Sequence, residues 1–135
     1  TFSVRLFLEK KKIQKGTGGF EYVDPSGLNE KDSAEFYFKR GHCYFERNDF
    51  DEARQDLKRV KDLDTRYKST ATYYYSHIAY EEGSNQTALD GFLQLENDEN
   101  FKPLVPYYVT QIYYKQGRYD EVLSYSTTFL DSSLE

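Results

Sequence analysis

The sequence has no methionine and no tryptophan, and it contains one cysteine and three prolines among its 135 residues. A single cysteine excludes an internal disulfide and any zinc site built from several cysteines. The mean hydropathy is -0.86, and no apolar run approaches the ~20 residues that a membrane-spanning helix needs. A membrane-spanning chain is therefore excluded. Because methionine is absent, we expect that Thr1 is not a translation start and that the chain is either processed or cut from a longer protein.

Basic residues are scarce in the second half of the chain. Residues 67–135 hold four Lys and Arg against ten Asp and Glu, and the whole chain carries a net charge of -5. Binding to a nucleic-acid backbone needs clustered Lys and Arg. The one basic run, Lys10 to Lys12 with Lys15, is short and typical of a solvated helix face. We therefore expect no nucleic-acid partner.

Aromatic residues, by contrast, are abundant, and they recur. The chain has 14 Tyr and 10 Phe, which disfavours disorder. One series of recurring residues, Tyr44, Tyr80 and Tyr113, has sequence spacings of 36 and 33. Two further series have spacings of 35 and 34: the first is Ala53, Ala88 and Val122, and the second is Val60, Leu95 and Phe129. We attribute the drift to a second turn that is one residue shorter. A period of about 34 residues is typical of solenoids made of helical hairpins.

Local signals divide each repeat into two helices. The pattern predicts helices at 2–11, 13–22, 30–46, 50–63, 68–82, 86–97, 104–116 and 119–130. Asp49 with Glu52 predicts a helix cap, and Pro103 suits the first turn of the helix at 104–116. Gly117 is expected to end that helix. The small residues Gly41, Ala53 and Ala88 are expected where two helices approach closely.

These residues resemble the tetratricopeptide repeat. The matching positions are Tyr37, Gly41, Tyr44, Phe50, Ala53, Leu57 and Val60, then Tyr73, Tyr80, Ala88, Phe92 and Leu95, then Tyr113, Gly117, Tyr119, Val122 and Phe129. The resemblance implies an all-α fold, a right-handed superhelix of helix hairpins. Residues 30–66, 67–101 and 102–135 would be three repeats, preceded by a degenerate hairpin at 1–29, in one continuous solenoid domain. Arg40 departs from the pattern, because Leu is usual there.

The resemblance also implies a binding surface. In this family the first helix of each repeat lines the concave face, which places there Phe38, His42, Phe45, Tyr74, Ile78, Glu82, Tyr107, Gln111 and Tyr114. An aromatic groove with polar tips suits a peptide or protein segment, because such side chains supply both area and hydrogen bonds. The alternative is that several of these aromatics only pack between repeats.

No residue set predicts catalysis or a cofactor. His42 and His77 do not share a repeat position in this alignment, so no recurring ligand pair is expected, and neither is interpreted as a metal ligand. Cys43 has no base that we can place beside it and is interpreted as a structural thiol. We expect a protein that is not an enzyme and uses no cofactor or metal.

The expected function is a non-catalytic scaffold for protein–protein interaction. The alternative is a structural spacer within a longer repeat protein. The segments AEFYFKRGHCYF, YYYSHIAYEEG and VPYYVTQIYYKQGRYDEV are similar to long multi-repeat bacterial envelope proteins, which implies a periplasmic or envelope-associated location, with the cytoplasm as the alternative. Weak self-association is expected through the apolar, uncapped last helix, which carries Val122, Leu123, Tyr125, Phe129 and Leu130.

Overall fold

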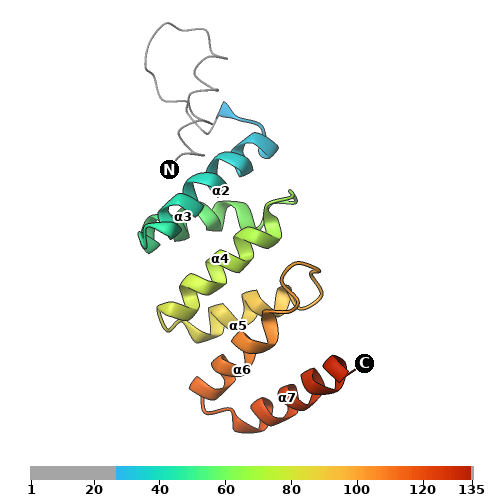
Figure 1. Ribbon diagram of the computed structural model, residues 1–135. Coiled ribbons are helices and arrows are strands. Elements are labelled where there is room, and N and C mark those ends of the chain that lie inside the picture. The colour runs from blue at the N-terminus through green and yellow to red at the C-terminus, as the bar shows by residue number, and fades with distance from the viewer. Residues whose placement is uncertain (1–26, 135) are drawn as a thin grey trace, which may run out of the picture. The chain divides into compact units, whose positions relative to one another are not determined.

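The structure, a computed structural model, describes residues 27–134, with side chains through Thr128. The described part of the chain consists of helices and their connecting loops and contains no strand (Figure 1), which confirms the all-α class. They are α2 (Glu30–Glu46), α3 (Phe50–Lys61), α4 (Lys68–Glu81), α5 (Asn85–Gln94), α6 (Val105–Lys115) and α7 (Tyr119–Leu134). The helices expected at 2–11 and 13–22 lie outside the described residues.

The chain divides into two compact units, and the division falls inside α4. The first unit runs to Tyr74 and the second covers Tyr75–Glu135. In the first unit α2 packs against α3; in the second, α5 packs against α6 and α6 against α7.

The same turn closes each helical hairpin. Its central residue has a left-handed backbone, with φ of 63° at Asn48, 80° at Gly83 and 72° at Gly117. A helix that ends on such a residue can satisfy its last carbonyls with the N–H groups that follow. Gly117 therefore ends α6 as expected. The three central residues follow one another at sequence spacings of 35 and 34, which confirms the period.

The turns also correct the alignment of the second repeat. The N–H groups of Asp49, Ser84 and Arg118 donate to the carbonyls of Tyr44, Ala79 and Tyr113, at 2.9, 2.8 and 2.8 Å. Ala79, rather than Tyr80, is therefore the equivalent of Tyr44. Three residues separate the helices in every hairpin, so the expectation of a shorter second turn was wrong. The aromatic doublets of one repeat match those of another almost equally well when the alignment is shifted by one residue.

Two expected helix starts also differ. Asp49 makes no side-chain capping bond, because its carboxylate pairs with Arg47 at 3.1 Å instead. Pro103 lies before α6, and the proline in the first turn of α6 is Pro106 instead. At the start of α2, a cap that was not expected is present, since the side chain of Asn29 accepts a 2.8 Å hydrogen bond from the Asp32 N–H.

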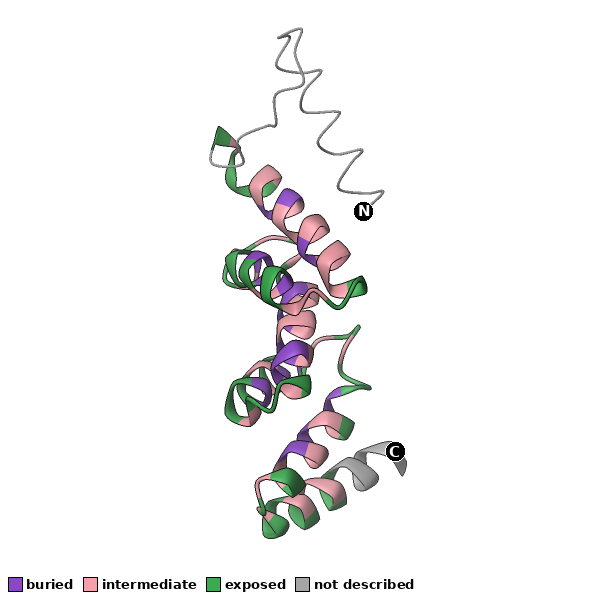
Figure 2. Cartoon of the chain, turned by 90° about the vertical axis from the view of Figure 1, so that its left-hand side faces the viewer, coloured by how far each residue is buried: buried purple, intermediate pink, exposed green. Residues whose placement is uncertain are grey.

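Small residues sit where the helices of a hairpin cross. Ala53 and Ala88 are fully buried, as expected. Gly41 lies against α3 so closely that an added Cβ would be 3.1 Å from the Asp56 Cβ. In the second unit the glycine is on the other helix, because a Cβ on Gly91 would collide with Ser76 Oγ of α4. Figure 2 shows the buried residues as stripes along the helices.

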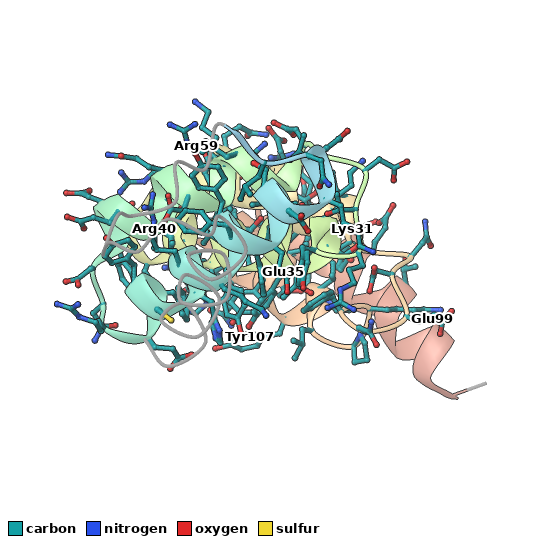
Figure 3. All side chains as sticks on the ribbon, turned by 90° about the horizontal axis from the view of Figure 1, so that it is seen from above. Lys31, Glu35, Arg40, Arg59, Glu99 and Tyr107 are labelled. Carbon is teal, nitrogen blue, oxygen red and sulfur yellow. The ribbon has the colours of Figure 1, made fainter. Side chains whose placement is uncertain are left out.

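Arg40 departs from the repeat pattern because it has a buried partner. Its guanidinium donates two hydrogen bonds of 2.8 Å to the Asp56 carboxylate of α3. The Asp56 side chain is 4% exposed and that of Arg40 is 36% exposed. The hydrogen bonds to Asp56 raise the pKa of the Arg40 guanidinium, which also lies 4.9 Å from the centre of the Phe36 ring. Arg40 is labelled in Figure 3.

Candidate functional site

In the first unit, four predicted site residues form one aromatic cluster. Tyr74 of α4 lies with its ring centre 4.7 Å from Phe45, 5.0 Å from His42 and 6.4 Å from Phe38, all on α2. Its hydroxyl is 3.3 Å from His42 Nε2. Burial raises the pKa of Tyr74 above its usual range, and the nearby Glu46 carboxylate adds to the shift. The structure therefore brings these residues together, each half-buried.

The second unit contains an equivalent cluster around Tyr108 of α6. Its ring stacks on Phe92 of α5 at 4.2 Å and meets Tyr80 and His77 of α4 edge-on at 5.4 and 5.9 Å. The Tyr108 hydroxyl is 3.2 Å from His77 Nδ1. Tyr108 follows Tyr74 by one repeat period, so the two tyrosines hold the same repeat position. Tyr108 was not among the residues predicted from the sequence, although Phe92, Tyr80 and His77, which it contacts, were named for other reasons.

The two histidines are equivalent as well, which corrects their assignment to unrelated positions. His77 follows His42 by one repeat period, and each histidine has a glutamate at the fourth position after it. His42 Nε2 lies 3.1 Å from Glu46, and His77 Nε2 lies 3.6 Å from Glu81. The signal was present in the sequence as a repeated His-x-x-x-Glu pattern, which needs no alignment to be seen and was overlooked.

Ile78 was predicted to contact a partner, and the structure contradicts this. The side chain is fully buried, with 0% exposure. In the corrected alignment the second-repeat equivalents of Phe38, His42 and Phe45 are Tyr73, His77 and Tyr80. Each of these is half-buried.

The third set of predicted site residues lies on α6 and is the most exposed. Tyr107 and Tyr114 are 61% and 63% exposed, and Gln111 between them is half-buried. Their spacing of four and three residues places them on one face of the helix. Tyr107 is labelled in Figure 3. We call Tyr107, Gln111 and Tyr114 the α6 face.

The last helix presents further apolar surface. Leu123 of α7 is 68% exposed and Tyr119 is 59% exposed. No residue is buried over 119–128, the part of α7 whose side chains are described, as Figure 2 shows by colour. Tyr119 lies edge-on to Tyr114, with ring centres 5.7 Å apart, so this surface continues the α6 face. The expectation for Phe129 and Leu130 falls outside the described side chains.

A hollow of about 450 Å³ lies in the first unit, between the start of α2 and the connection from α3 to α4. Its lining residues are Lys31, Glu35, Asp64, Thr65, Arg66 and Tyr67. Two cations and two carboxylates line it, so it favours neither an anion nor a cation.

Metal and membrane sites are not found in the described residues. Between residues 27 and 134, His, Cys, Asp and Glu do not gather in threes around a point that could hold a metal ion. Among α2 to α7, none is both long and apolar enough to span a bilayer. Cys43, the one cysteine of the sequence, is half-buried.

Repeated hairpins that are each closed by the same left-handed turn define a helical-repeat protein. Residues 34–67, which comprise most of α2, all of α3 and the following loop, match the family model of the tetratricopeptide repeat. The chain therefore carries a tetratricopeptide repeat, a unit that typically serves non-catalytic scaffolds of protein–protein interaction. No curated protein and no solved structure matches the chain.

Proposed function

We propose that the chain is a non-catalytic scaffold that binds a peptide or protein segment through the aromatic residues of its first helices. The observation that carries this proposal is the α6 face, whose tyrosines are 61% and 63% exposed on either side of Gln111. Exposed tyrosine is enriched at protein interfaces, because its ring supplies apolar area and its hydroxyl a hydrogen bond. The cluster of Phe38, His42, Phe45 and Tyr74 offers a second, half-exposed surface.

Selection of peptides from a random displayed library against the whole chain tests the proposal. Selected peptides should lose at least ~10-fold in affinity for a Tyr107→Ser/Tyr114→Ser variant, as is usual when anchors are removed. The matched control is Gln55→Ser/Lys58→Ser on the exposed side of α3, which should bind like the wild type. Selection that yields no binder, or binders that ignore both the α6 face and the cluster around Tyr74, would favour the spacer.

Two finer points accompany the proposal. Weak self-association through the apolar surface of α7 is expected, and sedimentation of Leu123→Ser at increasing concentration tests it. A periplasmic or envelope location rests on the resemblance to bacterial envelope repeat proteins alone. Fractionation of cells that express the native full-length protein would distinguish it from the cytoplasm.

A further inference from the structure

The helices α2 and α4 each have a face that is equivalent to the α6 face, and in both cases a tyrosine of another helix covers it. In the first unit, α2 carries Phe38, His42 and Phe45 at spacings of four and three residues. Tyr74 of α4, the first helix of the following repeat, lies on them. In the second unit, His77 and Tyr80 on α4 receive Tyr108 of α6. Each tyrosine directs its hydroxyl to the histidine, at 3.3 and 3.2 Å.

The α6 face repeats this arrangement for a third time. Tyr107 and Tyr114 hold the positions of Phe38 and Phe45, since they follow them by two repeat periods. Gln111 holds the histidine position, and its amide can donate to or accept from a hydroxyl. The two flanking tyrosines remain 61% and 63% exposed, whereas their equivalents on α2 are half-buried beside Tyr74.

We propose that the α6 face receives the tyrosine of an amphipathic helix from a partner protein, seated as Tyr74 and Tyr108 are seated. This inference rests on the proposed function and specifies its partner. The ring would lie between Tyr107 and Tyr114, and the hydroxyl would bond to the Gln111 amide. Two copies of the same contact within one chain support it, since the geometry needed is already built twice.

The charge beside the α6 face specifies the partner further. Four residues after His42 and His77 the chain has Glu46 and Glu81, but four residues after Gln111 it has Lys115. Lys115 is exposed, with its Nζ 3.9 Å from the centre of the Tyr80 ring. The edge that is negative in the first two clusters is therefore positive here. A helix with acidic residues beside its tyrosine fits this edge.

A second copy of this chain fits the α6 face less well. In the corrected alignment, the α2 residue at the position of Tyr74 and Tyr108 is Lys39. Docking of α2 from a second copy would bring a lysine, which pairs with Glu35 at 2.9 Å, onto a site that requires an aromatic ring and lies beside Lys115. This mismatch argues against a second copy of this chain as the partner.

The test uses the whole chain and helical peptides of about 15 residues, stapled with a hydrocarbon link because free helices of this length are marginal in water. Each peptide has one central tyrosine and flanking glutamates. Fluorescence anisotropy should show binding that weakens at least ~10-fold when the peptide tyrosine becomes alanine. Replacing the flanking glutamates with lysines should weaken binding ~3-fold or more, and Lys115→Glu in the chain should reverse that preference. The Tyr107→Ser/Tyr114→Ser variant should lose binding, while Gln55→Ser/Lys58→Ser should retain it.

Four results would overturn the inference. The first is equal affinity for the tyrosine and alanine peptides, and the second is an affinity that does not change when the flanking glutamates become lysines. The third is peptide binding that persists in the Tyr107→Ser/Tyr114→Ser variant, and the fourth is a dimer of the chain that covers the α6 face. If library peptides bind the α6 face in an extended form without tyrosine, the proposed function stands and the helix inference fails. If neither stapled nor library peptides bind, both fail.

Discussion

At the level of single residues, the Arg40–Asp56 pair shows why a charged side chain replaces the usual leucine. The carboxylate is buried to 4% exposure and holds both guanidinium hydrogen bonds at 2.8 Å. A buried charge without its partner is far less favourable than a neutral pair of apolar residues. The departure at Arg40 is visible in the sequence, but its partner Asp56 is not, because a pairing between two helices depends on the crossing geometry of α2 and α3.

Changing Arg40 alone should therefore destabilise the fold. Because the guanidinium is one-third exposed, we expect Arg40→Leu to lower the free energy of unfolding by about 2 kcal/mol, less than the roughly 3–5 kcal/mol of fully buried pairs. The double variant Arg40→Leu/Asp56→Ala should recover at least half of the loss, since no charge stays buried. Urea unfolding followed by circular dichroism measures both. An unchanged stability in Arg40→Leu would mean that the pair contributes nothing.

The contact between Gly91 and Ser76 predicts a second effect. An alanine at Gly91 would place its Cβ against Ser76 Oγ and 3.0 Å from the Ser76 Cβ, so Gly91→Ala should lower stability by about 1–3 kcal/mol. Adding Ser76→Gly moves the small residue to the other helix, as in the hairpin that contains Gly41, and should restore much of the loss. A double-mutant cycle in urea gives the coupling. Additive effects of the two changes would contradict the close contact.

At the level of the helices, much could be predicted from sequence. The span of α2 was predicted as observed, and the other described helices differ by no more than four residues at either end. The register within the second repeat could not be predicted. Tyr73-Tyr74-Tyr75 and Tyr113-Tyr114 offer equivalent matches when shifted by one residue, and only the turn hydrogen bonds decide between them. The buried Ile78 was assigned to the surface for that reason.

The left-handed turn residues give a prediction for the first hairpin. Asn48 adopts φ of 63° where the other two hairpins use glycine. A left-handed backbone is unfavourable for a residue with a Cβ, although asparagine tolerates it better than most. Asn48→Gly should raise stability by about 0.5–1 kcal/mol, and Gly83→Asn should lower it by a similar amount. Thermal unfolding measures both. A lower melting temperature for Asn48→Gly would show that the asparagine side chain has a stabilising role of its own.

At the level of the whole molecule, the structure brings part of the predicted surface together. The predicted residues of α2 lie in one cluster with Tyr74, and those of α6 share one face, because first-helix positions are shared among repeats. The resemblance to the repeat family could not tell which aromatics remain exposed, since that depends on whether a tyrosine of the following first helix covers them. Phe38 and Phe45 are half-buried with Tyr74, whereas Tyr107 and Tyr114 are exposed.

Stability of the whole molecule should also fall in alkali. Burial, with a smaller contribution from nearby carboxylates, raises the pKa of both Tyr74 and Tyr125. In the unfolded chain these tyrosines ionise near pH 10, while the folded chain still holds their protons. Stability is therefore unaffected below about pH 10 and declines as the pH rises through the raised values.

Urea unfolding from pH 8 to 11 should show this decline, and Tyr74→Phe/Tyr125→Phe should make it shallower. Tyr107→Phe is the control, because Tyr107 is 61% exposed, and this change should leave the slope as it is in the wild type. A decline that is equally steep in the double variant would assign the effect to other groups.

The alternating position of the small residue restricts how these repeats can be recombined. The α2 and α3 pair fits because glycine is on α2, and the α4 and α5 pair fits because glycine is on α5. A hybrid of α2 with α5 would put two glycines at the crossing and leave a gap, whereas α4 with α3 would put Ser76 against Asp56 and force the helices apart. Duplication or shuffling of this sequence can therefore preserve packing only when both helices of a hairpin move together.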